Sequence, residues 1–250
     1  MIENSKRSLS FSPNASLDEL ISIAQSRFPV SFETIKIGPY SLDILQISDL
    51  EAYIDHLGSV TSEGKGLELP FWAKIWPTSI LLSYYVQRLP QTKIDSILEL
   101  GAGVGVCGLF AAKHGFKVTI SDNHDDALLF SQINILKNDL SSQAQVLPID
   151  FTHDILPSRF PLILGSEILY RESTYRPLIE FLINHLAHSP TAEIVLAKNY
   201  TLSAKTFFEL AQEEFKISEK TIGYKEDNSS TERSSEKHLC QIYRLNPKDI

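Results

Sequence analysis

Three glycines and two carboxylates near the middle of the chain have the types and spacing to do chemistry together. The segment ILELGAGVGVCGLF places Glu99 two residues before Gly101, with Gly103 and Gly105 following. Only glycine lets a backbone turn this tightly and approach a ligand this closely. Asp122 follows roughly 20 residues past the first glycine, at the tip of the next β-branched run, where a carboxylate can accept hydrogen bonds from both ribose hydroxyls. The spacing predicts an adenosine-binding site.

The charge beside the glycines decides which cofactor this site suits. A dinucleotide site would have its third glycine at position 106, which is Val106, and its diphosphate would lie near Glu99. Like charges disfavour that pairing. S-adenosylmethionine instead brings an ammonium and a sulfonium group, which Glu99 attracts directly or through backbone and water. We therefore expect S-adenosylmethionine, and a nicotinamide dehydrogenase is the least favoured alternative.

Each of the two acids also has a purely structural interpretation. Asp122 could cap the helix expected to start near Asp125, and Glu99 could be a solvated strand end. The acid before the glycines, the glycines themselves and the acid at the next strand tip occur together, and that combination favours cofactor binding.

The elements that must position these residues alternate along the chain. After residue 93, short β-branched runs are followed by segments with helical periodicity, as in KVTISD and then DDALLFSQINILKN. This βαβ order predicts an α/β fold with a parallel sheet and helices on both faces. The last two runs, FKISEKTI and HLCQIYRL, flank a long polar loop and predict an antiparallel end to the sheet.

Residues 1–66 are expected to form an N-terminal extension and residues 67–250 the catalytic domain. The Ser- and Asn-rich residues 1–16 are predicted to be unstructured. Ser16 and Glu19 predict the capped start of a short helix, and the alternating segment VSFETIKIGPYSLDILQI predicts a β-hairpin. A further helix is expected after Pro77.

Composition and charge exclude several classes of protein. The 250 residues are 43% hydrophobic and 22% charged, which is typical of a folded globular protein. A net charge of −8 argues against stable nucleic-acid binding through summed basic charge. No apolar run approaches the length of a membrane span, and the start lacks the apolar centre of a secretory signal. We expect a cytoplasmic monomer without membrane attachment.

The cysteines and histidines predict neither a disulfide framework nor a metal site. Cys107 and Cys240 are the only thiols, and no histidine has metal-ligand spacing relative to them. Cys107 is expected to pack as a small apolar group on the helix after the glycines.

Residues 67–245 resemble the class I, seven-stranded S-adenosylmethionine-dependent methyltransferases. The segments PFWAKIWPTSILLSYYV, ELGAGVG and LILGSEILY, together with Asp150-Phe151, resemble methyltransferase family 16 within that class. This family includes protein-lysine methyltransferases that act on elongation factors, chaperones and the electron-transfer flavoprotein β subunit. The resemblance implies a Rossmann-like, seven-stranded, mostly parallel sheet, S-adenosylmethionine as cofactor and a protein substrate.

The resemblance also implies which residues bind the cofactor. Trp76 would pack beside it, Gly101, Ala102 and Gly103 would wrap its methionyl part, and Asp122 would hold its ribose. Trp76 and its neighbour Trp72 could equally be core rings packed against the N-terminal hairpin.

The next matching residues would complete the adenine pocket and the acceptor channel. Phe151 would lie against the adenine where relatives often have Trp, with Asp150 near the exocyclic amine and Ser166 in the same pocket. The acid-x-x-Tyr signature of the family matches Glu167-Ile168-Leu169-Tyr170, so Glu167 and Tyr170 would line the acceptor channel. Glu in place of the common Asp moves the carboxylate about one methylene further out, and Tyr170 could alternatively be a buried ring with a satisfied hydroxyl.

Other functions remain open on the sequence. A small-molecule methyltransferase would share the cofactor corner, and an interaction protein on a methyltransferase scaffold would keep the fold with the cofactor structural or absent. Nucleic-acid amine methylation is less favoured, because SEILY stands where an Asn/Asp-Pro-Pro-Tyr/Phe stretch would be needed. The polar loop at 223–237 and the hairpin are candidates for partner choice, although their composition also suits solvated linkers.

Overall fold

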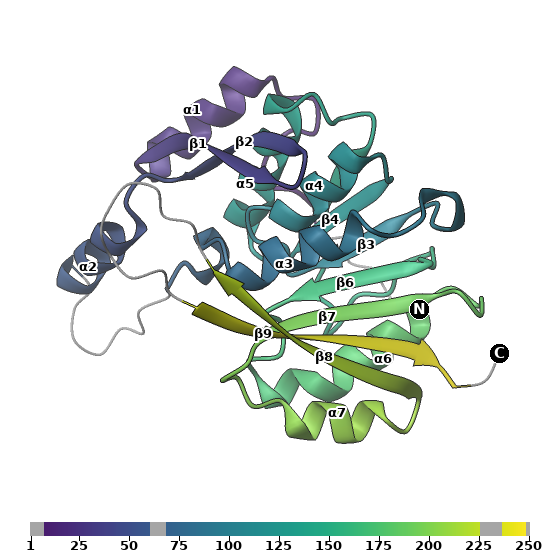
Figure 1. Cartoon of the computed structure of the whole chain (residues 1–250). Coiled ribbons are helices and arrows are strands. Elements are labelled where there is room, and N and C mark those ends of the chain that lie inside the picture. Colours follow the sequence, from purple (N-terminus) through teal and green to yellow (C-terminus); the bar gives the residue numbers. More distant parts are fainter. Residues whose placement is uncertain (1–7, 61–68, 226–236, 249–250) are drawn as a thin grey trace, which may run out of the picture.

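A seven-stranded sheet forms the centre of the fold (Figure 1). The structure is a computed structural model that describes residues 8–60, 69–225 and 237–248. The strand order is β5-β4-β3-β6-β7-β9-β8, with parallel pairing from β5 to β7 and antiparallel pairing of β9 to both of its neighbours. The strands are β3 (Ile97–Leu100), β4 (Val118–Asp122), β5 (Ala144–Pro148), β6 (Leu162–Ser166), β7 (Glu193–Asn199), β8 (Phe215–Lys225) and β9 (Lys237–Pro247). The predicted mostly parallel sheet with an antiparallel end is confirmed.

Helices cover both faces of this sheet, as the alternating pattern predicts (Figure 1). Successive strand residues point to opposite faces, so Ile97 belongs to one hydrophobic cluster and Leu98 to the other. Helices α3, α4 and α5 pack on the first face, and α6 and α7 on the second. The helices are α3 (Pro77–Val86), α4 (Val106–His114), α5 (Asp125–Lys137), α6 (Tyr175–His185) and α7 (Lys205–Ala211), with 3₁₀ turns at Phe71–Ala73, Gln91–Lys93 and Glu172–Thr174.

The N-terminal extension contains the expected helix and hairpin. Helix α1 (Leu17–Arg27) begins with the predicted capping box of Ser16 and Glu19, and β1 (Val30–Ile37) pairs antiparallel with β2 (Tyr40–Ile47). Both elements contribute to the hydrophobic cluster of α3, α4 and α5, with Leu20 and Ile44 fully buried. The hairpin therefore lies directly on the helices that follow the glycine segment.

Two features of the extension differ from the sequence prediction. Residues 8–16 precede the first helix but are not simply unstructured, because Phe11 is buried in the same cluster and Leu9 packs against it. Helix α2 (Leu50–Val60) was not predicted at all. Its signal was Asp49, whose carboxylate accepts from the Ala52 N–H at 2.9 Å, as a helix-capping residue does.

Some expectations concern residues outside the described ranges. Most of the polar loop proposed for partner choice falls within 226–236, and part of the first 16 residues falls within 1–7. Cys107 is fully buried on α4, as predicted. In the described ranges, none of the helices has the length and apolarity needed to cross a membrane.

Candidate active site

The carboxyl ends of β3, β4 and β6 meet at one edge of the sheet. Strand β3 lies between β4 and β6, so the chain leaves β3 toward one neighbour and returns later to the other. Leu100 at the end of β3 is level with Gly165 near the end of β6. This reversal of strand order is the place where open α/β sheets bind ligands.

The glycine segment turns the chain from β3 into α4. Gly101, Gly103 and Gly105 have φ angles of 59°, 57° and 84°, in the left-handed region that favours glycine. A Cβ on Gly103 would lie 2.5 Å from the carbonyl oxygen of Trp72, and one on Gly101 would lie 2.6 Å from Cγ2 of Ile168. The turn therefore requires glycine both for its backbone shape and for its close packing.

Asp122 joins the tip of β4 to this turn. Its Oδ2 accepts from the Gly103 N–H and its Oδ1 from the His124 N–H, both at 2.9 Å. Burial raises the pKa of Asp122, and these N–H donors oppose the rise. Each carboxylate oxygen keeps a second lone pair. The position predicted for the ribose-binding carboxylate is thus at the edge of the glycine turn, with the carboxylate already oriented by the backbone.

Glu99 lies beneath the turn rather than at its surface. Its side chain is on the α4 side of β3, 2% exposed, and its Oε2 accepts from the Gly108 N–H at 2.7 Å. Burial raises the pKa of Glu99 to about 8, with a smaller contribution from Asp122, while the Gly108 N–H opposes the rise. The carboxyl group is therefore bound to the backbone at the start of α4.

Asp150 and Phe151 follow β5 and lie beside the end of β4. The Ile149 N–H donates to the Asp122 carbonyl at 3.1 Å, which brings the two segments together. Asp150 accepts from the N–H and hydroxyl of Thr152. Burial acts to raise the pKa of Asp150, but the hydrogen bonds from Thr152 and the nearby His153 outweigh it and leave the pKa below its usual value.

Ser166, at the end of β6, connects this strand to the start of α3. Its hydroxyl donates to Oγ1 of the buried Thr78 at 2.8 Å. Trp76 is the N-cap of α3, and its indole N–H donates to the Phe71 carbonyl at 3.3 Å. The Trp-Pro segment is therefore placed against the same edge of the sheet.

Trp72 packs against the hydrophobic core, which was the alternative interpretation of the two tryptophans. It stacks on His124 with ring centroids 5.1 Å apart and meets Phe28 and Phe130 edge to face. Its ring thereby packs between the end of α1 and α5, while its backbone closes over Gly103.

Glu167 is held in a strained conformation directly after β6. Its φ of 55° lies in the left-handed region, which costs a residue with a Cβ about 1–2 kcal/mol. Its N–H donates to the Ala197 carbonyl at 2.9 Å, and its Oε1 accepts from the Asn199 N–H at 2.7 Å. Burial raises the pKa of Glu167, opposed by hydrogen bonds from Thr78 and Asn199 and by the charge of Lys198. Such strain concentrates at functional sites.

Tyr170, the second residue of the predicted acceptor channel, is not a buried ring. Its side chain is 65% exposed and stacks against the guanidinium of Arg171 at 5.5 Å. The nearby Tyr200 is 52% exposed, and it follows the Asn199 N–H that binds Glu167. Tyr170 thus lies three residues after the strained glutamate in the sequence, and Tyr200 directly follows the residue that binds its carboxylate.

Sequence reasoning missed the residues that hold the site from elsewhere in the chain. These are Thr78 on α3, His124 after β4, and Lys198 and Asn199 at the end of β7. Lys198 is buried, and its ammonium donates to the carbonyls of Asn199 and Leu202. The only sequence signal for them was their position at the carboxyl ends of predicted strands or the start of a helix.

The buried carboxylates of this edge fit a cationic cofactor. Burial raises the pKa of Glu99, Asp122 and Glu167, so each anion is costly without a compensating positive charge. A diphosphate would add negative charge, whereas the sulfonium and ammonium of S-adenosylmethionine would offset it. In the residues that the structure describes, no cluster of His, Cys, Asp and Glu side chains could hold a metal ion instead.

Comparisons with known proteins identify the family. Residues 66–214 match the family described as lysine methyltransferase. EEF1A lysine methyltransferase 3 of Mus musculus is 30% identical over 196 residues, which cover 74% of this chain and 83% of that protein. Protein N-lysine methyltransferase METTL21A of Mus musculus is 28% identical over 153 residues, covering 58% and 69% respectively.

The fold also matches solved methyltransferase structures. N-methyltransferase NodS from Bradyrhizobium japonicum, in complex with S-adenosyl-L-homocysteine, superimposes with a TM-score of 0.54 over 81% of this chain and 100% of that chain. At 15% identity this likeness bears on the fold alone. The family match, together with the glycine turn and the buried carboxylates around it, shows that this chain belongs to the lysine methyltransferase family and depends on S-adenosylmethionine.

Proposed function

We propose that this chain methylates a lysine side chain of a protein substrate at the carboxyl edge of its sheet. The observation that carries the proposal is Glu167, strained and half-buried beside the glycine turn. The names of the relatives EEF1A lysine methyltransferase 3 and protein N-lysine methyltransferase METTL21A support a protein acceptor.

The cofactor would be held by the residues that the turn brings together. Gly101, Ala102, Gly103 and Gly105 would wrap the methionyl part, and Asp122 would accept from the ribose hydroxyls. Glu99 is bound to Gly108 and would act on the cofactor through the field across the turn, since the cofactor's positive charge would lower the raised pKa of Glu99 and favour its ionised form. When bound, the cofactor supplies a methyl group on a positive sulfur, and the carbon–sulfur bond breaks as the acceptor nitrogen forms its bond to that carbon.

The remaining cofactor residues would form the adenine and methyl ends of the pocket. We propose that Phe151 lies against the adenine, with Asp150 near its amine, and that Trp76 packs beside the cofactor. Ser166, bonded to Thr78, would line the wall between this pocket and the acceptor.

The acceptor channel must remove a proton from the incoming lysine. With an ordinary pKa near 10.4, only about one lysine in a thousand is neutral at pH 7.4, which costs about 4 kcal/mol. Glu167 can bind the incoming ammonium and accept its proton directly or through water, and its raised pKa favours that acceptance. Tyr170 would wall the path by which the lysine reaches the methyl group.

The proposal also covers the domain organisation, the class of acceptor and the location of the chain. We propose that residues 67–250 form the catalytic domain and residues 1–66 an extension docked on it. The net charge of −8 supports a protein rather than a nucleic-acid acceptor. We propose that the chain works as a cytoplasmic monomer.

Labelled cofactor identifies the acceptor. Cell extract treated with the purified chain and S-adenosylmethionine carrying a deuterated methyl group should yield a labelled lysine in one or a few proteins, read by mass spectrometry of peptides. The same extract with the Glu167→Ala variant is the control and should yield none. Label found only in small molecules, in nucleic acid or on a histidine would refute the proposed acceptor.

A further inference from the structure

Helix α5 binds the glycine turn and the N-terminal hairpin at the same time. Asn134, at the start of the last turn of the helix, is fully buried. Its Nδ2 donates to the carbonyl of Val104 in the glycine turn at 3.1 Å, and its Oδ1 accepts from the N–H of Leu45 on β2 at 2.7 Å. One side chain thus joins two segments that are far apart in the sequence.

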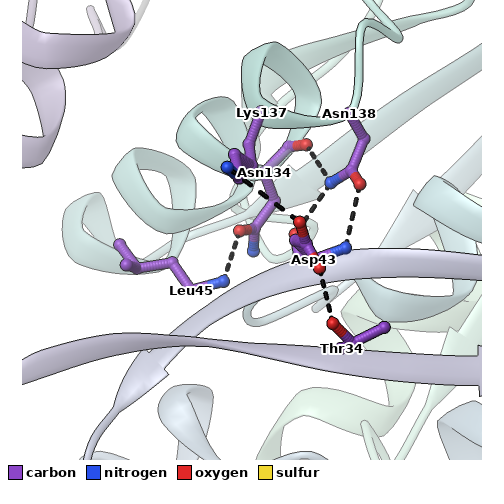
Figure 2. A network of polar contacts seen from close by, with 6 residues as sticks. All are labelled: Thr34, Asp43, Leu45, Asn134, Lys137 and Asn138. Atoms are coloured by element: carbon purple, nitrogen blue, oxygen red, sulfur yellow. Dashed lines mark hydrogen bonds and ion pairs between the residues drawn. The ribbon is translucent and has the colours of Figure 1, made fainter.

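The free edge of strand β2 is hydrogen-bonded by asparagine side chains at the end of α5, where a further strand could otherwise pair. In the two-stranded hairpin β2 pairs with β1, and on its other edge the N–H groups of Asp43 and Leu45 donate to Asn138 and Asn134 (Figure 2). Residues four apart on a helix rise about 6 Å, and residues two apart on a strand rise about 6.6 Å. The two asparagines therefore match the spacing of the strand's free edge.

Two residues of this face of α5 and its C-cap, Asn138, divide the two tasks between them. The Ser131 hydroxyl donates to the Gly103 carbonyl at 2.9 Å and so holds the glycine turn. Asn138 accepts from the Asp43 N–H at 2.9 Å and donates to the Asp43 carbonyl at 2.8 Å, so it holds the hairpin. Asn134 lies between them and binds both segments.

A buried asparagine in a helix is costly unless its amide is satisfied. Asn is a poor helix former, and an unpaired buried amide costs on the order of a hydrogen bond or more. Loss of the hairpin would leave Oδ1 without the Leu45 donor, and loss of the turn would leave Nδ2 without the Val104 acceptor. The Asn134 amide is therefore fully satisfied only when both the hairpin and the glycine turn are in place.

We propose that Asn134 is a positioning residue that couples the N-terminal hairpin to the cofactor turn. The docked hairpin fixes the amide, which fixes the Val104 carbonyl and thereby the turn that follows Gly103. Because coupling of two sites is reciprocal, cofactor binding must in turn tighten the hairpin. The inference rests on the proposal that the turn from Gly101 to Gly105 holds the cofactor.

Ser131, Asn134 and the C-cap Asn138 supply a matched set of variants in the full chain. Calorimetry should give a dissociation constant for S-adenosylmethionine that rises about tenfold in Asn134→Ala and severalfold in Ser131→Ala. In Asn138→Ala it should rise by less than in Asn134→Ala, about two- to threefold, because this variant loses two hairpin hydrogen bonds but keeps the bond between Leu45 and Asn134. Amide exchange across β2, measured by NMR without cofactor, should speed up most in Asn134→Ala and Asn138→Ala and least in Ser131→Ala.

A measurement on the unmodified chain covers the case in which Asn134→Ala fails to fold. Saturating S-adenosylmethionine should slow exchange of the Leu45 amide severalfold, and Ser131→Ala should retain that protection once saturated. An unchanged Leu45 exchange rate would overturn the coupling, as would equal cofactor affinities in foldable Asn134→Ala and Asn138→Ala. If the unmodified chain binds no S-adenosylmethionine, the proposed site itself is wrong and the inference falls with it.

Discussion

The cofactor side and the acceptor side of the active-site edge are built differently. On the cofactor side, the backbone and side chains bind one another: Asp122 holds Gly103, Ser131 holds the same residue's carbonyl, and Glu99 holds α4. On the acceptor side, the rings of Tyr170 and Tyr200 are 65% and 52% exposed. The difference teaches that the proposed cofactor side is organised by contacts within this chain, whereas the proposed acceptor side leaves two rings exposed for a partner to cover.

Glu167 lies at the border between the two sides. Its N–H is bound to the Ala197 carbonyl and its carboxylate to the Asn199 N–H, so it is held by contacts within the chain, like the residues of the cofactor side. Its half-buried carboxyl has a raised pKa in spite of the charges of Lys198 and Lys74, and an incoming lysine ammonium would further stabilise the ionised form. We expect substitutions on the two sides to separate cofactor affinity from acceptor turnover.

The largest effect is expected from Gly103→Ala. The added Cβ would lie 2.5 Å from the Trp72 carbonyl oxygen, at a φ of 57°. Strain and the backbone clash together should lower the free energy of unfolding by about 3–5 kcal/mol and abolish measurable cofactor binding. Thermal unfolding and calorimetry with S-adenosylmethionine test both effects.

The matched control is Gly58→Ala in helix α2. A Cβ there meets no atom within 4 Å, so the substitution should stabilise the helix by about 0.5–1 kcal/mol. If Gly103→Ala proves as harmless as this control, the turn is not the rigid, packed element described above.

Glu99→Gln should change how stability depends on pH. Folding raises the pKa of Glu99 from 4.5 to about 8 through burial, so the folded state holds a proton that the unfolded state releases in that window. The free energy of unfolding therefore falls as the pH rises from 4.5 to about 8. Glutamine keeps an acceptor for the Gly108 N–H and removes the charge, so the variant should be more stable at pH 8 by on the order of 3 kcal/mol.

Denaturant titrations at pH 5 and pH 8 measure this effect without cofactor. The two proteins should differ little at pH 5 and most at pH 8. Parallel stability curves for the two proteins over this range would show that Glu99 is not a strained buried anion.

Asp122→Asn should weaken the cofactor side selectively. One of its two oxygens becomes an NH₂ group, which cannot accept a hydrogen bond. The asparagine can therefore accept from the Gly103 N–H or from the His124 N–H, but not from both. The lost charge-assisted hydrogen bonds are worth about 2 kcal/mol, or roughly 30-fold in the dissociation constant of S-adenosylmethionine. Turnover at saturating cofactor should change much less, and a variant with full affinity but impaired turnover would reverse the assignment of Asp122.

Tyr170→Ala should give the smallest effect, limited to the acceptor side. Removing an exposed ring that a partner covers costs about 1 kcal/mol, or roughly fivefold in KM for the protein acceptor. Cofactor affinity should stay unchanged, and Tyr170→Phe should keep the KM near its original value. Steady-state methylation with the acceptor identified by mass spectrometry gives these numbers, and a loss of cofactor affinity would place Tyr170 on the other side.

The order of elements could be predicted because it depends on local patterns. Strand and helix periods, the glycines at 101, 103 and 105, and the capping box at Ser16 each act within a few residues. Phe11 was missed because its burial depends on helices that lie far along the chain. The polar composition of the N-terminal segment does not indicate that the Phe11 ring packs in their hydrophobic cluster.

The contacts that hold the site could not be predicted for the same reason. Asn134 and Leu45 are 89 residues apart, and Ser166 and Thr78 are 88 apart. An asparagine in a helical pattern looks neutral in sequence, and only the packing of the hairpin on α5 gives it a partner. The exposed position of Tyr170 likewise follows from the chain path after Glu167 rather than from its own residue type.

The most direct test of the account measures two quantities on the Glu167→Gln variant. Glutamine can still accept from the Asn199 N–H, so the fold and the cofactor pocket should be preserved. Calorimetry should give a dissociation constant for S-adenosylmethionine within about twofold of the unmodified chain, while single-turnover methylation of the lysine acceptor should slow by about 100-fold or more. Methylation at the original rate, or a loss of cofactor affinity as large as the loss of rate, would contradict the separation of the two sides.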